Sequence, residues 1–185
     1  DQILDGNATG WSPGKYGNGM GFEGKGDYVD CGTDSSIFPD AFTVEAWVKT
    51  METHYNPLLG WTSAYSTALY VTWPAPSSFI FLAEDNYRQF SHSPVNIIDG
   101  NWHHIAFVVT GNGQNDIDNA KMYADGQEQT IADTVKTGSP DAKTLCYIGR
   151  VIGYYFNGTL DEVRIYKRAL APEEIRTHYL RGSGH

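Results

Sequence analysis

The sequence predicts an all-β protein in which antiparallel sheets pack as a sandwich. Of its 185 residues, 14% are aromatic and 20 are glycine, a composition typical of folds built from strands and turns. Several segments alternate between apolar and polar residues, the period of a strand with one face in a core. The length suits one domain, since single all-β sandwiches commonly reach about 200 residues. We therefore expect residues 1–185 to form a single domain.

The charge and hydropathy of the chain exclude two classes of partner. The formal net charge is -9, and no cluster of Lys and Arg interrupts this acidic balance. Nucleic acid, which binds clustered positive charge, is therefore not an expected partner. No window approaches the roughly 18 consecutive apolar residues of a membrane span, so direct insertion into a membrane is not expected either.

The first half of the chain opens without periodicity and then alternates. Residues 1–19 are rich in Gly, Asn and Ser and predict an irregular lead-in. Two short strands follow around the turn at 24–27, with Phe22 and Val29 facing inward. Residues 42–49 alternate cleanly and predict a central strand on whose polar side Trp47 packs under a loop. Between Thr50 and Pro94 the chain becomes aromatic and polar, with strands expected over 68–73, 79–82 and 89–92.

The second half predicts further strands and one helix. A strand follows the turn at Asp99–Gly100, and a polar loop covers 111–119. The pair Asp125–Gly126 indicates a hairpin after the strand from Lys121, because both central positions of such a turn need φ > 0. The closing strand places Asp161 and Glu162 at its start, with Val163 and Ile165 facing the core. Residues 171–180 predict a short surface helix, since Pro172 and acids occupy its first turn, and 181–185 form a tail.

The two cysteines, Cys31 and Cys146, share strand parity with the apolar residues Val29 and Ile148. Both thiols should therefore point inward. A disulfide across the core suits a secreted protein, and two small buried thiols fill the same space equally well, so the sequence leaves both arrangements open.

Several segments resemble the LamG-like members of the concanavalin A-like lectin/glucanase superfamily, and they occur in the family's order. They are FEGKGDYV at 22–29, FTVEAWV at 42–48, WHHIA at 102–106, KMYADG at 121–126, LCYIGR at 145–150 and GTLDEVRIYKRAL at 158–170. The resemblance covers most of residues 20–180. It implies a jelly-roll β-sandwich of two antiparallel sheets with a short C-terminal helix, and it implies that the family's first strand is missing from the lead-in.

The resemblance also implies a structural Ca²⁺ ion where the opening hairpin meets the closing strand. The corresponding residues are Glu23, Asp27 and Asp161, whose carboxylates supply the hard oxygen ligands that Ca²⁺ prefers. Glu23 stands where the family usually has Asp. The alternative is a hairpin with solvated acids.

Catalysis is not expected, although the superfamily contains glucanases. Those enzymes need two carboxylates across a cleft, commonly delivered as E-x-D-x-E along one strand face, and the sequence lacks that motif. Glu45 stands alone on its strand, and the motifs of the lyase relatives are absent too. His103 and His104 are neighbours on a strand, so they point to opposite faces and cannot share one metal ion.

Recognition by aromatic side chains remains, because Trp and Tyr rings stack on the apolar faces of sugars while polar neighbours bind the hydroxyls. The candidate ligand-binding residues are Trp61, Tyr65, Trp73, Tyr87, Arg88, Tyr154 and Tyr155. Core packing is the alternative for each of them except Trp73, whose Pro-rich following loop favours exposure.

The sequence therefore predicts a non-catalytic, lectin-like module that binds a glycan and is stabilised by calcium. The resemblance implies an extracellular setting, as part of a larger secreted or cell-surface protein. The alternative is a structural or adhesive module that contacts a cell-surface or matrix protein without a sugar site. An exposed apolar patch on a sheet face would favour that alternative.

Overall fold

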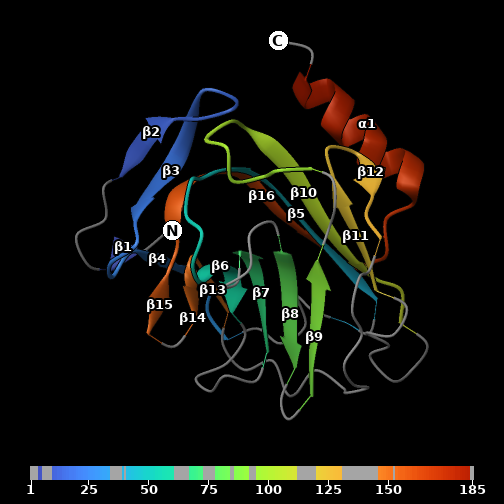
Figure 1. Cartoon of the computed structure of the whole chain (residues 1–185), viewed down its shortest axis with the longest axis horizontal. Coiled ribbons are helices and arrows are strands. Elements are labelled where there is room, and N and C mark those ends of the chain that lie inside the picture. Colours follow the sequence, from blue (N-terminus) through green and yellow to red (C-terminus); the bar gives the residue numbers. More distant parts are fainter. Residues whose placement is uncertain are drawn as a thin grey trace.

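The computed structural model describes residues 4–5, 10–33, 39, 41–60, 67–72, 78–83, 86–91, 95–111, 120–130, 146–151 and 153–183. Two antiparallel sheets lie face to face, and one helix lies against the outside of one of them (Figure 1). The predicted all-β sandwich with a short C-terminal helix is confirmed.

The first sheet, sheet A, includes the strands of the aromatic segment between Thr50 and Pro94. Its strands, in spatial order, are β1 (Leu4–Asp5), β4 (Tyr28–Asp30), β13 (Tyr147–Ile148), β6 (Asn56–Gly60), β7 (Thr67–Thr72), β8 (Ser78–Ala83) and β9 (Asn86–Ser91). The last three match the strands predicted in the aromatic region to within three residues at each end. A small hairpin of β14 (Arg150–Val151) and β15 (Tyr154–Tyr155) pairs separately.

Sheet B faces sheet A across the core. Its strands, in spatial order, are β12 (Gln127–Glu128), β11 (Lys121–Ala124), β10 (His103–Val109), β5 (Phe42–Lys49), β16 (Asn157–Tyr166), β3 (Asn18–Glu23) and β2 (Trp11–Pro13). The central strand β5 pairs with β10 on one side and β16 on the other. The predicted β11–β12 hairpin is present, with φ of 50° at Asp125 and 73° at Gly126.

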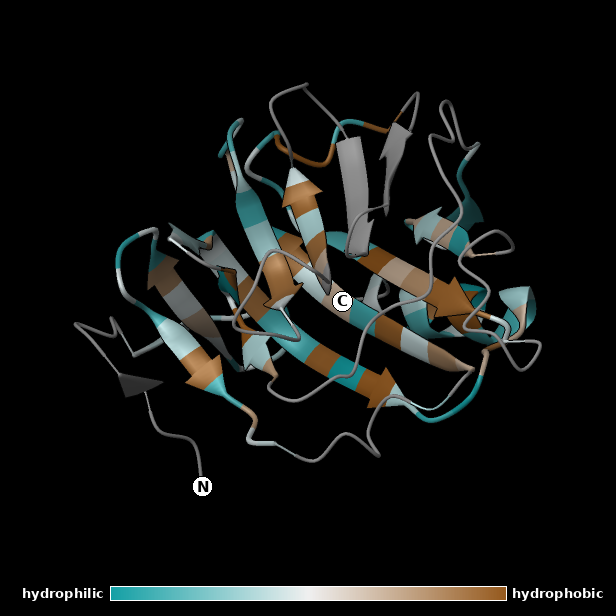
Figure 2. Cartoon of the chain, turned by 90° about the horizontal axis from the view of Figure 1, so that it is seen from below, coloured by the Kyte–Doolittle hydropathy of each residue, from teal (hydrophilic) through white to brown (hydrophobic). Residues whose placement is uncertain are grey.

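The core lies between the two sheets and comes from alternate residues of the strands, as the colouring of Figure 2 shows. On β5, Phe42, Val44, Ala46 and Val48 face the core and are at most 1% exposed. Burying one large apolar side chain of this kind contributes about 1.5–3 kcal/mol. Because these four residues face the core, the residues that alternate with them along β5 must face outward.

The lead-in is more regular than the sequence predicts. Residues 1–19, expected to be irregular, contain β1 at the edge of sheet A and β2 at the edge of sheet B. Trp11 pairs with Met20, and Pro13 pairs with Asn18. Strands of two or three residues are too short to show an alternating pattern, which is why periodicity misses them.

The closing strand begins earlier than predicted and carries a bulge. β16 starts at Asn157, so Asp161 and Glu162 lie in its middle rather than at its start. The register with β5 shifts between Asp161 and Arg164, and Glu162 has a φ of 51°. A bulge adds a residue to one strand and bends it. Asp161 and Arg164, three residues apart, therefore pair with Trp47 and Glu45, which lie on one face of β5.

Helix α1 (Pro172–Ser183) covers part of the outer face of sheet B, beside β10, β11 and β12 (Figure 1). Ile175 is fully buried, and it packs with Leu170 against Ala106 and Tyr123 of the sheet. The helix begins with half of a capping box, since the carboxylate of Glu174 accepts the backbone N–H of Ala171 at 2.9 Å, while Ala171 has no side chain to accept a bond in return. Among the described residues, no helix is long and apolar enough to cross a membrane.

The cysteines face each other across β4 and β13. Cys31 donates its backbone N–H to the carbonyl of Cys146 at 2.8 Å, and both residues are free thiols. A hydrogen bond from the Cys146 thiol lowers the pKa of Cys31, and the same hydrogen bond, together with burial, raises the pKa of Cys146. Of the two arrangements left open by the sequence, the structure contains the pair of thiols.

Candidate functional site

The outer face of sheet A carries three tyrosines around one arginine, which we call the tyrosine–arginine face: Tyr28, Tyr147, Arg150 and Tyr155. Val29 and Ile148 are paired neighbours that pack on the core side. Successive side chains of a strand point to opposite faces, so Tyr28 and Tyr147 lie on the outer side of the sheet. Arg150 and Tyr155 are paired residues of the β14–β15 hairpin.

Arg150 is held by these rings. The carbon of its guanidinium lies 4.5 Å from the ring centroid of Tyr28, 5.0 Å from that of Tyr147 and 6.0 Å from that of Tyr155. The rings of Tyr28 and Tyr147 also meet edge to face, with centroids 5.4 Å apart. All three distances fall within the range of cation–π attraction. The guanidinium is therefore fixed in place by ring contacts.

A second tyrosine cluster holds the β14–β15 hairpin against sheet A. Tyr154 packs against Tyr55 with ring centroids 4.4 Å apart and ring planes tilted by 37°, and Val151 packs with Ala68 and Tyr70. Gly60 of β6 permits this close approach, because a Cβ there would lie 2.5 Å from the carbonyl oxygen of Arg150. The hairpin that carries Arg150 and Tyr155 thus rests directly on the sheet, and a rigid base of this kind preorganises the groups above it.

The predicted ligand-binding residues fall into three groups. Tyr154 and Tyr155 lie on the β14–β15 hairpin, half-buried, as described above. Tyr87 and Arg88 lie on β9 of sheet A, where the structure describes the backbone alone. Trp61, Tyr65 and Trp73 lie outside the described residues altogether. The prediction that these residues bind a ligand stays a prediction.

Sequence reasoning missed Tyr28, Tyr147 and Arg150. All three lie inside segments that match the family pattern, so they were interpreted only as strand residues. Their parity was the available signal, because Tyr28 alternates with inward-facing Val29 and Tyr147 alternates with Ile148. That signal places the two tyrosines on the outer face, whereas Arg150 shares the parity of Ile148 and has no such signal. The meeting of the three side chains depends on the pairing of β4 with β13.

The residues predicted to bind calcium are not brought together. Asp27 is 1% exposed; one carboxylate oxygen accepts the backbone N–H of Glu23 at 2.9 Å, and Oδ1 has no hydrogen-bond partner among the described residues. Asp161 lies elsewhere and accepts the backbone N–H groups of Tyr16 and Glu162, both at 2.8 Å. Glu23 pairs with Asn157, which is four residues, or about 13 Å, from Asp161 along β16. Within the described ranges, no three His, Cys, Asp or Glu side chains are arranged to hold a metal ion.

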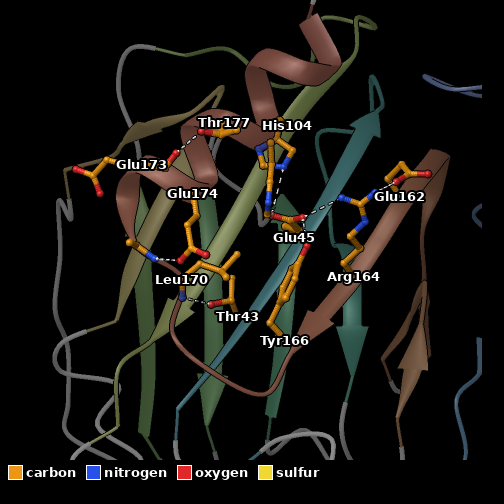
Figure 3. Close-up of polar contacts among 12 residues, drawn as sticks. Thr43, Glu45, His104, Glu162, Arg164, Tyr166, Leu170, Glu173, Glu174 and Thr177 are labelled. Atoms are coloured by element: carbon orange, nitrogen blue, oxygen red, sulfur yellow. Dashed lines mark hydrogen bonds and ion pairs between the residues drawn. The ribbon is translucent and has the colours of Figure 1, made fainter.

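On the opposite side of the molecule, Glu45 organises the surface beneath α1 (Figure 3). Its carboxylate is 2% exposed and accepts hydrogen bonds from the Tyr166 hydroxyl at 2.8 Å and from Nδ1 of His178 at 2.9 Å. Arg164 lies 3.5 Å from the same carboxylate, and Nε2 of His104 lies 3.7 Å from it. Glu45 thus joins three strands to the helix.

A cavity of about 350 Å³ opens beside this cluster, lined by Tyr16, Glu45, Trp47, His104, Glu162, Arg164, His178 and Arg181. Trp47 is 3% exposed and stacks on Tyr179 of α1, with centroids 5.9 Å apart. Lys15 places its ammonium 4.6 Å from the Trp47 ring. Trp47 is therefore a packing residue, as predicted, but it packs under helix α1 rather than under a loop, and the edge it leaves open lines the cavity.

The neighbouring histidines have opposite electrostatic environments. Hydrogen bonding to Asp125, at 2.9 Å, raises the pKa of His103. Burial lowers the pKa of His104 to about 4, against a smaller raising effect of Glu45. His104 is therefore neutral in the folded protein at neutral pH. The two imidazoles face different carboxylates, His103 facing Asp125 and His104 facing Glu45.

Comparisons with known proteins identify the fold family. A family model described as the concanavalin A-like lectin/glucanases superfamily matches residues 23–176, which include every strand from β4 to β16. A sequence search of curated proteins found no match.

Solved structures show the same architecture. Domain 4 of AbnA, a GH43 extracellular arabinanase from Geobacillus stearothermophilus solved with arabinotriose, has a TM-score of 0.72 at 19% identity, covering 96% of this chain and 86% of that one. The binding domain of Paraclostridial Mosquitocidal Protein 1 has a TM-score of 0.72 at 14% identity, over 97% of this chain and 47% of that one. A third structure comes from botulinum neurotoxin type C, a toxin whose cell entry depends on interaction with two ganglioside molecules. It has a TM-score of 0.68 at 11% identity, over 98% of this chain and 46% of that one.

The two toxin chains are about twice as long as this one, and at these identities all three structures share the fold alone. The family match spans well over half of the chain and agrees with the strand order. This protein therefore belongs to the concanavalin A-like lectin/glucanases superfamily.

Proposed function

We propose that this protein is a non-catalytic carbohydrate-binding module and that its tyrosine–arginine face contacts the glycan. The observation that carries this proposal is the grouping of Tyr28, Tyr147 and Tyr155 within 6.0 Å of one guanidinium on the outer face of sheet A. Aromatic rings stack on the C–H faces of sugars, and a nearby polar group fixes orientation. The face supplies both kinds of group on a rigid base.

The similar structures support a carbohydrate ligand. The arabinanase domain was solved with arabinotriose, and the neurotoxin enters cells through gangliosides. Arabinotriose is a sugar and gangliosides carry sugars, so both proteins interact with carbohydrate-containing molecules. The arabinanase is also extracellular, which supports our further proposal that this chain works outside the cell as part of a larger secreted or surface protein.

The environment of the described carboxylates supports a non-catalytic role. Glycoside hydrolases need one carboxylic acid and one carboxylate facing a shared cleft. Glu45 is buried under α1 and accepts hydrogen bonds from Tyr166 and His178. Asp161 is engaged by two backbone N–H groups. Both carboxylates therefore have structural partners.

The adhesive alternative needs a contiguous apolar surface. Among the described residues, the exposed large apolar side chains are Trp11, Met51 and Leu180. They lie on β2, after β5 and on α1, so they are scattered singly, as on ordinary soluble surfaces. This distribution favours the glycan-binding proposal.

The test is a glycan array followed by titration of the strongest hits with Tyr155→Ala. Losing one stacking ring is expected to weaken binding about tenfold, or ~1.4 kcal/mol. The matched control is Trp11→Ala, which removes an aromatic ring that is 71% exposed on the edge of sheet B. Equal losses in both variants, or unchanged affinity in Tyr155→Ala, would place the site elsewhere.

We also propose that a calcium ion, if one is bound, is held at Asp27 rather than at Asp161. Oδ1 of Asp27 is a buried carboxylate oxygen with no hydrogen-bond partner, and a cation would satisfy it. When bound, the ion would neutralise this buried charge and brace the β3–β4 turn. Asp161 already has two N–H partners.

Thermal melts with Ca²⁺ or EDTA test this proposal. Because a ligand that binds only the folded state raises its stability, Ca²⁺ is expected to raise the Tm of the wild type and of Asp161→Asn, but not of Asp27→Asn. Equal midpoints of the wild type in Ca²⁺ and EDTA would refute the calcium site. A response that survives Asp27→Asn would refute the assignment to Asp27.

A further inference from the structure

We infer that the tyrosine–arginine face selects glycans that present an anionic group, a carboxylate or a sulfate, and that Arg150 binds this group. The inference rests on the proposed function and adds the chemical class of the ligand to it. It follows from the charge of Arg150, which has no ion-pair partner among the described residues, rather than from the tyrosines.

Arg150 carries a positive charge that no carboxylate of the described residues balances. Two other described arginines are ion-paired: Arg164 with Glu162 and Glu45, and Arg168 with Glu174 at 2.7 Å. Among the described residues, the side-chain partners of Arg150 are tyrosine rings, at 4.5, 5.0 and 6.0 Å. Carboxylates are plentiful in a protein of net charge -9. The half-buried guanidinium of Arg150 nevertheless lies against three tyrosine rings.

Ring contacts leave the guanidinium ready for a ligand. Cation–π contacts engage its flat faces, whereas its N–H groups point outward in the plane. A planar guanidinium binds the two oxygens of a carboxylate or sulfate bidentately, and these charge-assisted hydrogen bonds are stronger than neutral ones. The Tyr147 and Tyr155 rings beside it supply the stacking surface for the sugar. An acidic sugar would therefore engage both parts of the face at once.

The acidic surface of the protein does not prevent this binding. Repulsion from distant carboxylates is screened over about 8 Å at physiological ionic strength, whereas a contact ion pair is screened much less. Arg150 would form such a contact ion pair with the anionic group of the ligand, so its attraction is screened less than the distant repulsion. The net charge instead reduces the expected salt response, since screening weakens the local attraction and the distant repulsion, and these two effects on affinity oppose each other.

Matched pairs of glycans test the inference on the full chain. The probes are trigalacturonic acid against its methyl ester, 3′-sialyllactose against lactose, and sulfated against unsulfated N-acetyllactosamine, titrated by calorimetry. We expect the wild type to prefer the acidic member of at least one pair by about tenfold, as a bidentate charged contact implies. The pairs separate carboxylate from sulfate recognition.

Two variants locate the preference. Arg150→Gln is expected to bind the acidic and neutral members of each pair equally, because the tyrosine rings remain while the charged group that distinguishes the two members is gone. Arg150→Lys keeps the charge but loses the planar fork, so most of the preference should disappear. Circular dichroism confirms that each variant is folded, and if Arg150→Gln does not fold, Arg150→Lys carries the test.

The outcomes distinguish the inference from the proposal beneath it. Wild-type protein that binds the two members of every pair equally overturns the anionic preference and leaves glycan binding intact. A preference that survives in both Arg150 variants overturns the role of Arg150. Wild-type protein that binds no glycan, on the array or in titration, overturns the proposed function and this inference together.

Discussion

Replacing Glu45 with alanine is expected to lower the free energy of unfolding by about 4 kcal/mol, since removing one partner from a buried charged cluster typically costs about 3–5 kcal/mol. The carboxylate is 2% exposed, and it accepts hydrogen bonds from Tyr166 at 2.8 Å and His178 at 2.9 Å. Without it, the Tyr166 hydroxyl and the helix residue His178 lose their partner. Chemical denaturation measures the change as a shift in midpoint at constant m value.

Glu162→Ala is the matched control, because Glu162 contacts the same Arg164 but is 33% exposed. Exposed ion pairs contribute about 1 kcal/mol or less, so this variant should lose little stability. Equal losses in the two variants would mean that Glu45 is no more than a surface ion-pair partner. A large loss confined to Glu45→Ala supports its role in fixing α1 to sheet B (Figure 3).

The second large effect is a loss of stability in mild acid that depends on His104. Burial lowers the pKa of His104 from 6.5 to about 4 in the folded protein. Below pH 6.5 the unfolded chain takes up a proton that the folded chain does not, so the unfolded state is favoured increasingly as the pH falls towards 4. Stability contributed by neutral His104 is therefore complete above pH 6.5 and lost between 6.5 and 4. The whole loss amounts to about 3 kcal/mol, at ~1.4 kcal/mol per pKa unit.

Unfolding free energies measured from pH 7 to pH 4 check this expectation in the wild type, His104→Gln and His103→Gln. His104→Gln should flatten the profile. His103→Gln should steepen it, because the hydrogen bond to Asp125 raises the pKa of His103 and stabilises the folded state in acid. An acid loss of the same size in His104→Gln as in the wild type would show that other groups cause it.

Much of the fold could be predicted from the sequence, because alternation is a local property. Phe42, Val44, Ala46 and Val48 share one parity, and all of them lie in the core. Pro172 and the acids after it predicted the helix, and Asp125–Gly126 predicted its hairpin. In each case neighbouring residues determine the backbone preference. The short strands β1 and β2, the strand β6, the β14–β15 hairpin and the bulge at Glu162 were not predicted, since they depend on pairing rather than on local pattern.

The candidate site could not be predicted in the same way. Tyr155 was named from sequence, but Tyr28 and Arg150 lie more than a hundred residues apart, and only the pairing of β4 with β13 brings them together. The same holds for Glu45, which looks isolated on its strand and acquires its partners from β10, β16 and α1. The sequence by itself determined which face of each strand is buried. The tertiary structure alone decided which outward-facing side chains meet, because strand register and sheet order arise from long-range hydrogen bonding that no local pattern specifies.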